Sequence, residues 1–257
     1  MQSLTIVKVG GAIVEEPQSL STLLDAFTLL KGNRLLVHGG GRTATRIAAA
    51  MGIETHMVNG RRITDADMLR IVTMVYGGLV NKQVVAQLAS RGVRALGLTG
   101  ADLAVICGHR RIVKPGDVDY GLVGDIDSVD AHALKHLIDG NIVPVMAPLA
   151  LGPDAQMLNT NADTIASEVA KALASLYDVT LIYCFEKKGV LSNADDEESV
   201  IPHIDTALYA RLKADGTIGG GMLPKLDNSF AALRAGVKRV VITRADQIGQ
   251  GGTTIEL

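Results

Sequence analysis

Residues 35–52 read LLVHGGGRTATRIAAAMG, and this stretch decides the fold class of the chain. The apolar run at 35–37 predicts a short buried strand, and the alanine-rich segment after the three glycines predicts a helix that ends near Gly52. A strand, a glycine turn and a helix in this order form the repeating unit of parallel sheets that are covered by helices. The stretch therefore predicts an α/β protein.

The same alternation continues on both sides of this unit. Helical stripes at 20–30, 67–90, 162–176 and 224–235 alternate with apolar strands at 4–9, 95–99, 142–146, 179–185 and 239–243. Residues 103–126 are rich in glycine, aspartate and β-branched residues, which favours hairpins. Pro144 argues for an irregular or edge strand at 142–146. We predict a mainly parallel open sheet with helices around it.

Composition limits the possible functions. The chain has 257 residues, of which 47% are hydrophobic, and a formal net charge of −2, so neither a nucleic acid nor a membrane surface is an expected partner. Cys107 and Cys184 lie far apart, which predicts reduced thiols and a cytoplasmic location. The six histidines show no ligand spacing, so we expect no metal held by the protein alone.

The turn Lys8-Val9-Gly10-Gly11 follows the first predicted strand. Two glycines allow backbone N–H groups to approach a phosphate, while the lysine ammonium neutralises its charge. A surface lysine beside an ordinary turn explains the same residues equally well.

The turn His38-Gly39-Gly40-Gly41-Arg42 joins a strand to a helix. An ordinary turn needs one or two glycines, and a third favours binding of an anion at the helix N-terminus. Gly39-x-Gly41-x-x-Ala44 also fits the dinucleotide-binding fingerprint of NAD-dependent oxidoreductases. That fingerprint requires an acidic residue about 20 positions later at the end of a strand, where Glu54 comes too early and Asp65 begins a helix.

Two later segments place polar residues at helix starts. Asn159 and Asn161 point the same way if their segment is extended, and Asp163 lies in the first turn of the next helix. Asn161 as an N-cap, followed by a carboxylate that the helix dipole favours, is the plain structural explanation. Lys225 follows the run Gly219-Gly220-Gly221 and opposes the dipole of its helix, which favours a functional role over a solvated lysine. The acidic run at 195–198 is interpreted as a solvated loop.

Taken together, these motifs resemble one known family. The motifs Lys8-x-Gly10-Gly11, His38-Gly39-Gly40-Gly41, Asn59-Gly60-Arg61-Arg62, Asn159-x-Asn161-Ala162-Asp163 and Gly221-Met222-x-x-Lys225 closely resemble those of the acetylglutamate kinases of arginine biosynthesis, within the amino acid kinase family. Residues 118–125 also look like a hairpin of that family. The resemblance extends from residue 4 to about residue 243.

The resemblance implies a three-layer αβα sandwich with two lobes. Residues 1–172 would bind the acylamino acid and form a homodimer, and residues 173–257 would bind ATP. The implied reaction is phosphorylation of the γ-carboxylate of N-acetyl-L-glutamate. By the same resemblance Lys8 and Lys225 are the catalytic cations, Asp163 orients them, and the substrate contacts are Gly40, Gly41, Arg62, Asn159 and Asn161.

The nucleotide site is also implied by the resemblance. ATP would bring Mg²⁺ on its phosphates, and the expected contacts are Gly10, Gly11, Glu186, Lys187, Lys188, Gly189, Thr217, Ile218 and Gly219. The family commonly has an aspartate where Glu186 stands, so Lys187 or Lys188 could meet phosphate or ribose instead. The chain also begins almost at Lys8, without the N-terminal helix of arginine-inhibited relatives, so we expect a dimer that arginine does not inhibit.

The implied chemistry explains these residue types. A glutamate side chain has a pKa near ~4.3, so it is already an anionic nucleophile at neutral pH and requires no general base. Two like charges ~4 Å apart repel each other by about 4 kcal/mol at an effective dielectric constant of 20. Lysines, backbone N–H groups and Mg²⁺ would offset this repulsion. Asp163 would keep the lysines aimed and charged without binding the metal directly.

Several alternatives stay open at this point. N-succinyl-L-glutamate, another acylamino acid or free glutamate could be the acceptor, and the second carboxylate of a succinyl group would need a cation such as Arg61 or Arg42. An NAD-binding oxidoreductase is a more remote alternative. A nucleotide sensor without activity would not need two cations aimed at one phosphoryl group.

Overall fold

The computed structural model describes residues 1–193, 195–219 and 222–257. Within these residues the main sheet has eight strands, and every neighbouring pair is parallel except β13 and β14. In spatial order the strands are β12 (His203–Ile204), β14 (Thr253–Ile255), β13 (Arg239–Arg244), β11 (Asp178–Phe185), β1 (Ser3–Val9), β2 (Asn33–His38), β8 (Val143–Met146) and β5 (Ala95–Leu98). The predicted mainly parallel sheet is confirmed.

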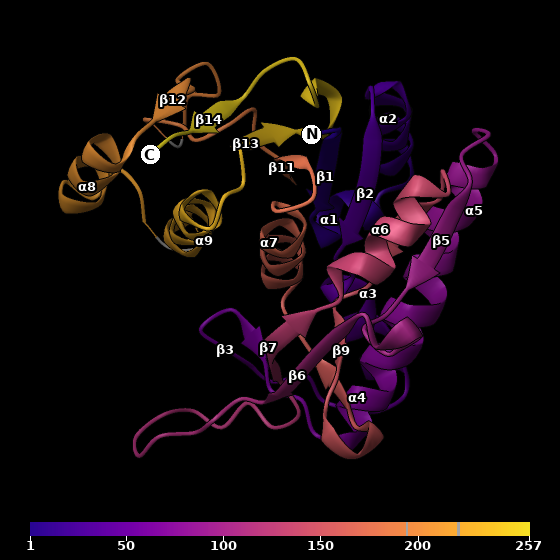
Figure 1. Ribbon diagram of the computed structural model, residues 1–257. Helices are drawn as coiled ribbons and strands as arrows, with labels where there is room; N and C mark the ends of the chain where they lie inside the picture. Colours follow the sequence, from indigo (N-terminus) through magenta and orange to yellow (C-terminus); the bar gives the residue numbers. More distant parts are fainter. Residues whose placement is uncertain (194, 220–221) are drawn as a thin grey trace.

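Alternate residues of the central strands enter two separate cores. Leu4 and Ile6 of β1 pack into one core, and Val7 and Val9 pack into the other. The first core contains α6 (Ala131–Asp139), α7 (Ala162–Leu173) and α9 (Met222–Arg234). The second contains α1 (Gly11–Glu15), α2 (Pro17–Leu29), α3 (Gly41–Ala50), α4 (Ala66–Val72), the π-helical segment η1 (Thr73–Val80) and α5 (Asn81–Ala89). Helices therefore cover both faces of the sheet, as the three-layer prediction requires (Figure 1).

The helix α2 shows how the sequence pattern produces this packing. Leu20, Leu23, Leu24 and Phe27 are all buried, at the i, i+3, i+4 and i+7 positions of the predicted stripe. At the N-terminus the Glu16 carboxylate accepts hydrogen bonds from the backbone N–H groups of residues 18 and 19. Capping and one apolar face together determine where this helix begins and which side it buries.

The predicted helix at 67–90 is built from three consecutive segments. Asp65 caps α4 by accepting a hydrogen bond from Met68 N–H, and the turns widen into η1 before α5 begins. Gly77 and Gly78 lie inside η1, where their low helix propensity allows the wider winding. The periodicity predicted the helix but did not predict the π-helical segment.

A smaller sheet and a hairpin lie beyond the carboxyl ends of the main strands. In the described residues the smaller sheet has the order β10 (Met157–Asn159), β9 (Leu149–Leu151), β6 (Ile106–Arg110) and β7 (Gly124–Val129). The antiparallel pairing of β6 with β7 confirms the hairpin predicted in residues 103–126. The loop joining these strands extends away from the body of the molecule (Figure 1). β3 (Met57–Val58) and β4 (Arg61–Arg62) form the separate hairpin, with Asn59 and Gly60 at positive φ in its turn.

Several elements differ from the sequence-based expectations. Pro144 predicted an irregular or edge strand, and the edge alternative is wrong because β8 is an inner strand between β2 and β5. The strand tolerates this proline because its pairing with β2 begins one residue later, at Val145. The helices α6 and α8 (Thr206–Ala214) and the short strands β12 and β14 were not predicted, since their apolar patterns are short.

The proposed boundary between two lobes falls within the last turn of α7. One continuous sheet crosses it, because β1 pairs with β11 along the whole strand. The division into residues 1–172 and 173–257 therefore stays a prediction about function. Among the described helices, none is both long enough and apolar enough to cross a membrane.

A polar network is buried between β2 and α5. The imidazole of His38 is fully buried, with Nδ1 at 2.7 Å from the Gly39 carbonyl oxygen and Nε2 at 3.1 Å from Asn81 Nδ2. Burial lowers the pKa of His38 to about 4; the hydrogen bond to Gly39 opposes this shift and the charge of Lys82 adds to it. The ring is therefore neutral at physiological pH.

We predict that this histidine makes the protein less stable in mild acid. The unfolded chain binds a proton near the ordinary pKa of 6.5, whereas the folded ring resists protonation until about pH 4. The free energy of unfolding should therefore fall between pH 6.5 and 4, by about 3 kcal/mol from this group. Urea unfolding at several pH values measures this fall. His38→Asn should remove that part of the pH dependence, and the exposed control His132→Asn should not; equal pH dependence in all three proteins would contradict the assignment.

Candidate functional site

The site forms where β1 and β2 end side by side. Val9 is paired with His38, so the turn after each strand lies against the other, at the carboxyl edge where open α/β sheets bind ligands. A Cβ atom on Gly39 would lie 2.9 Å from the backbone nitrogen of Gly11. Gly40 has φ of 157°, and a Cβ there would lie 3.0 Å from the ring of Tyr76. Close packing thus explains two of the three consecutive glycines.

A cavity of about 240 Å³ opens beside these turns. It contains eight of the residues that the sequence predicted for the site: Lys8, Gly11, Gly40, Gly41, Arg62, Asn159, Asn161 and Asp163. The other lining residues are Gly39, Met57, Gly60, Arg61, Tyr76, Arg111, Val123, Gly124, Pro148, Thr160, Ala162 and Thr164. Residues from eight separate parts of the sequence therefore meet around one small polar space.

An ion pair lies in the wall of this cavity. Lys8 Nζ is 2.6 Å from Asp163 Oδ1, and both side chains are largely buried. Asp163 is fixed in the first turn of α7, where its backbone N–H donates to the side-chain oxygen of Asn161 at 2.7 Å. The predicted N-cap is therefore confirmed, and the same cap places a carboxylate against the lysine.

Lys225 approaches this pair from the C-terminal part of the chain. Its Nζ lies 4.6 Å from the centre of the Phe185 ring, and Lys8 Nζ lies 5.4 Å from the same centre. Partial burial lowers the pKa of Lys225, the negative charge of Asp163 opposes this shift, and the positive charge of Lys8 adds to it. Lys225 is not a lining residue of the cavity itself. The two lysines that the sequence singled out therefore gather around one aromatic ring and one carboxylate.

Arg62 and Asn159 come from distant parts of the chain, and hydrogen bonds within the protein hold both side chains in place. Arg62 is 7% exposed, and its guanidinium donates to the Gly41 carbonyl oxygen at 2.8 Å and to Thr45 Oγ1 at 2.9 Å. Asn159 Nδ2 donates to Thr64 Oγ1 at 2.9 Å, which leaves the side-chain oxygen of the amide as an acceptor. These contacts fix a cation and an amide in the cavity before any ligand binds.

The sequence did not single out Tyr76 or Arg111, which also line the cavity. Tyr76 lies in η1, and no local pattern marks which face of that segment meets the glycine turn. Arg111 follows β6, and its guanidinium pairs with Asp125, whose hydrogen bonds raise the pKa of Arg111. Only the pairing of β6 with β7 brings this arginine to the site.

The two arginines considered for a second carboxylate have different positions. Arg61 lines the cavity. Arg42 is not a lining residue; its exposed guanidinium lies 3.7 Å from the carboxylate of Glu186. The expectation that Arg42 could serve the acyl group is therefore not supported by its position.

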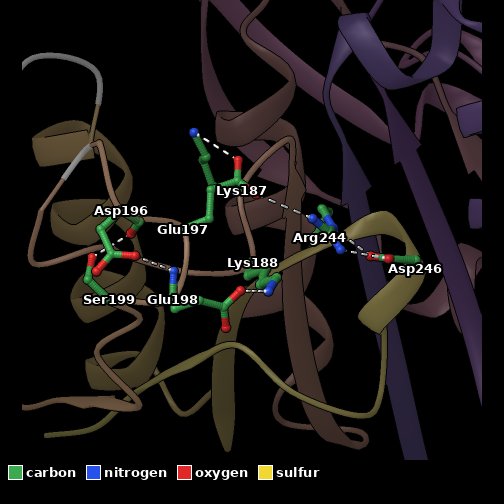
Figure 2. Close-up of polar contacts among 8 residues, drawn as sticks. All are labelled: Lys187, Lys188, Asp196, Glu197, Glu198, Ser199, Arg244 and Asp246. Carbon is green, nitrogen blue, oxygen red and sulfur yellow. Dashed lines mark hydrogen bonds and ion pairs between the residues drawn. The ribbon is translucent and has the colours of Figure 1, made fainter.

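The expected nucleotide residues after β11 lie outside the cavity. Lys187 Nζ lies 3.1 Å from Glu197 Oε1. Figure 2 shows this contact and the pairing of Lys188 with Glu198. Arg244, at the end of β13, contacts Glu197 at 3.8 Å and Asp246 at 2.8 Å (Figure 2). The acidic run is therefore not simply solvated, because two of its carboxylates neutralise basic residues at the carboxyl edge of the sheet.

The remaining nucleotide candidates lie in two places, Gly189 after β11 and residues 217–219 before α9. Gly189 is buried, and a Cβ there would lie 2.7 Å from Thr253 Oγ1. Thr217 and Gly219 are exposed, whereas the side chain of Ile218 is 4% exposed and packs into the first core. Ile218 could therefore contact a ligand only through its backbone. Gly220 and Gly221 of the last glycine motif lie outside the described residues.

The structure places no suitable acidic residue at either position that the dinucleotide-binding alternative offered, Glu54 or Asp65. Glu54 is exposed in the segment after α3, next to His56, and the strand that follows is the hairpin strand β3. Asp65 caps α4. Neither carboxylate ends a strand of the main sheet, as the ribose contact of that fingerprint requires.

Comparison with known proteins agrees with the family that the sequence motifs indicated. Residues 3–244 match the family model described as the amino acid kinase family. An acetylglutamate kinase of Bacteroides fragilis is 59% identical over 256 residues, 99% of this chain and 97% of the relative. An acetylglutamate kinase of Phocaeicola vulgatus is 60% identical over 254 residues, 99% of this chain and 98% of the relative.

A solved structure shows the same fold. The N-acetylglutamate synthase of Neisseria gonorrhoeae, complexed with coenzyme A and N-acetyl-glutamate, matches with a TM-score of 0.83 and 23% sequence identity. The match covers 100% of this chain and 59% of that chain, and at this identity it supports the fold alone. The chain belongs to the amino acid kinase family, and the resemblance to the acetylglutamate kinases that its motifs indicated is confirmed.

Proposed function

We propose that this protein transfers the γ-phosphoryl group of MgATP to the γ-carboxylate of N-acetyl-L-glutamate, a step of arginine biosynthesis. One observation carries the proposal: Lys8, Asp163 and Lys225 gather beside a cavity that also contains Arg62 and Asn159. The names of the full-length relatives support the same reaction.

The reaction needs cations more than it needs a base. A γ-carboxylate oxygen attacks the γ-phosphorus, the bond from that phosphorus to the β,γ-bridging oxygen breaks, and ADP leaves while an acyl phosphate forms. No proton is removed from the nucleophile, because a carboxylate is already ionised at neutral pH. Lys8 and Lys225 would stabilise the charge on the transferring group. Asp163 keeps Lys8 in place through the ion pair at 2.6 Å.

The cavity would hold the acylamino acid by its non-reacting groups. Arg62 would bind the α-carboxylate, and the oxygen of Asn159 would accept a hydrogen bond from the acyl amide. At the reacting end, Gly40 and Gly41 would present backbone N–H groups to the γ-carboxylate and to the phosphoryl group that it attacks, at the start of α3, where negative charge is favoured. These contacts would leave the γ-carboxylate directed toward Lys8.

ATP would bind along the carboxyl ends of β11 and β13, with Mg²⁺ as part of the nucleotide substrate. Lys187, Lys188 and Arg244 collect positive charge there, and Glu197 and Glu198 balance it (Figure 2). Asp163 would not need to bind the metal, because it is already paired with Lys8.

N-succinyl-L-glutamate is the alternative acceptor, which differs from N-acetyl-L-glutamate only in its acyl group. Arg61 lines the cavity and could bind a second carboxylate, as a succinyl group would require. A coupled assay of ADP release with acetyl- and succinyl-glutamate in parallel distinguishes the two. We expect turnover with acetylglutamate; turnover with succinylglutamate alone would assign the alternative, and turnover with neither would overturn the substrate class.

We also infer a cytoplasmic homodimer. Both cysteines are free and Cys184 is buried, as expected in a reducing compartment. Met51 and Met74 are more than half exposed beside an apolar cavity of about 560 Å³ that is lined by the segment after α3, by α4 and η1, and by residues 155–157. A second copy could cover this surface.

We predict that Lys8→Ala and Lys225→Ala each lower kcat by at least ~10²-fold, because a cation at the transferring group is lost. The KM for acetylglutamate should change less. Arg62→Ala should chiefly raise that KM, since Arg62 binds a carboxylate that does not react. Steady-state kinetics measures both, with Lys171→Ala, a pair partner of Glu168 on α7, as the control. The reverse pattern of effects would show that the assigned roles are wrong.

We predict that Lys188→Ala raises the KM for ATP by about threefold to tenfold, since a charged contact to the nucleotide is lost. The value of kcat should stay within about twofold, because this lysine does not reach the transferring group. Lys238→Ala is the matched control: Lys238 pairs with Asp178 at 3.0 Å at the opposite edge of the sheet. An unchanged KM for ATP in Lys188→Ala would remove this residue from the nucleotide site.

A further inference from the structure

His38 is a buried polar residue for which the proposed chemistry has no direct use. Its ring is completely buried between β2 and α5, although an apolar side chain would fill such a place without the desolvation penalty of an imidazole. Both ring nitrogens have partners: the Gly39 carbonyl oxygen at 2.7 Å and Asn81 Nδ2 at 3.1 Å. The ring therefore links the glycine turn of the site to the interior of the protein.

The partners of Asn81 determine which ring nitrogen carries the proton. Asn81 Nδ2 also donates to the Val145 carbonyl oxygen at 2.9 Å, which can only accept, and Asn81 Oδ1 accepts from Lys82 Nζ at 3.2 Å, which can only donate. This fixes the orientation of the amide. Its Nδ2 then donates to His38 Nε2, so the single proton of the neutral ring is on Nδ1 and is donated to the Gly39 carbonyl.

The sequence also provides the space that Asn81 needs. Gly97 of β5 lies against the amide, and a Cβ atom there would overlap Asn81 Oδ1. Lys82 Nζ completes the network by donating to the Gly97 carbonyl oxygen at 3.1 Å. Each member of the network has a partner, as a rigid buried polar network requires.

The hydrogen bond from His38 Nδ1 to the Gly39 carbonyl oxygen sets the direction of the Gly40 N–H group. In a trans peptide the C=O of Gly39 and the N–H of Gly40 point in opposite directions, so a carbonyl held by the buried ring turns the Gly40 N–H away from it. The Gly40 nitrogen lies 3.4 Å from the position that a Cβ atom on Gly11 would occupy. Gly11 lines the cavity. Among the residues that the structure describes, no acceptor bonds to the Gly40 N–H.

We propose that His38, oriented by Asn81, is a positioning residue that aims the Gly40 N–H at the phosphoryl group transferred in the cavity. The inference rests on the proposed function for the identity of that group. A preorganised N–H donor stabilises developing charge without reorganising during the reaction. His38 itself touches neither substrate, and it acts only through the Gly39–Gly40 peptide.

Two substitutions separate this role from simple packing. In asparagine the amide nitrogen is attached to Cγ, as Nδ1 is in histidine, so His38→Asn keeps a donor for the Gly39 carbonyl. In glutamine the amide nitrogen is one bond farther out and corresponds to Nε2, so His38→Gln loses that donor. Both variants remove the imidazole, and His38→Asn leaves the larger gap because its side chain is one methylene shorter, so packing alone would favour His38→Gln.

We expect His38→Gln to lower kcat by at least ~10-fold, from loss of one aligned donor, and His38→Asn to recover kcat to within about threefold of the wild type. The KM for acetylglutamate should change by less than about threefold in both, because Arg62 and Asn159 are untouched. Thermal unfolding of both variants is measured alongside. Equal kcat in the two variants, or a His38→Gln enzyme as fast as the wild type, would overturn the positioning role.

A second measurement uses the unmodified protein without substrates. Two-bond ¹H–¹⁵N NMR spectra of the histidine rings distinguish the two neutral tautomers, and we expect the Nδ1-protonated form for His38 from pH 6 to 8. The Nε2-protonated form would overturn the proposal even if neither variant folds. If the wild type shows no kinase activity while the Nδ1 tautomer is found, the proposed function fails and the orientation of the glycine turn stands.

Discussion

Two negatively charged reactants must meet if a carboxylate is to attack a phosphoryl group, and this repulsion is the constraint that the structure answers. Strand β1 places Lys8 next to the first turn of α7, where Asp163 Oδ1 lies 2.6 Å from the lysine Nζ. Lys225, on α9 at the same face of the sheet, lies against the same Phe185 ring. Two cations can share such a small space because the negative charge of Asp163 offsets part of their mutual repulsion.

Residues whose role depends on local geometry were predictable from the sequence. The cap by Asn161, the carboxylate of Asp163 and the glycine turns follow from helix starts and strand ends, and the structure places them as expected. Tyr76 and Arg111 were missed because only tertiary packing of η1 and the pairing of β6 with β7 bring them to the cavity. The same reason explains the acidic run, whose partners Lys187 and Lys188 are ten residues away along the chain.

The three glycines after β2 illustrate how one motif can have structural and chemical causes together. Gly39 is required by the approach of Gly11, and Gly40 by its φ and by the ring of Tyr76. The packing that demands these glycines also brings the N–H groups of the turn to the cavity. The sequence could not show that the histidine before them lies in a buried network with Asn81, 43 residues later.

The most direct test of the account is a crystal structure with acetylglutamate, MgADP and an aluminium fluoride that mimics the transferring phosphoryl group. The account predicts that Lys8 Nζ and Lys225 Nζ both lie within about 3.2 Å of fluoride or oxygen atoms of this group. A complex in which either ammonium lies well beyond that reach, with both reactants in place, would contradict the central claim that the two lysines jointly neutralise the charge.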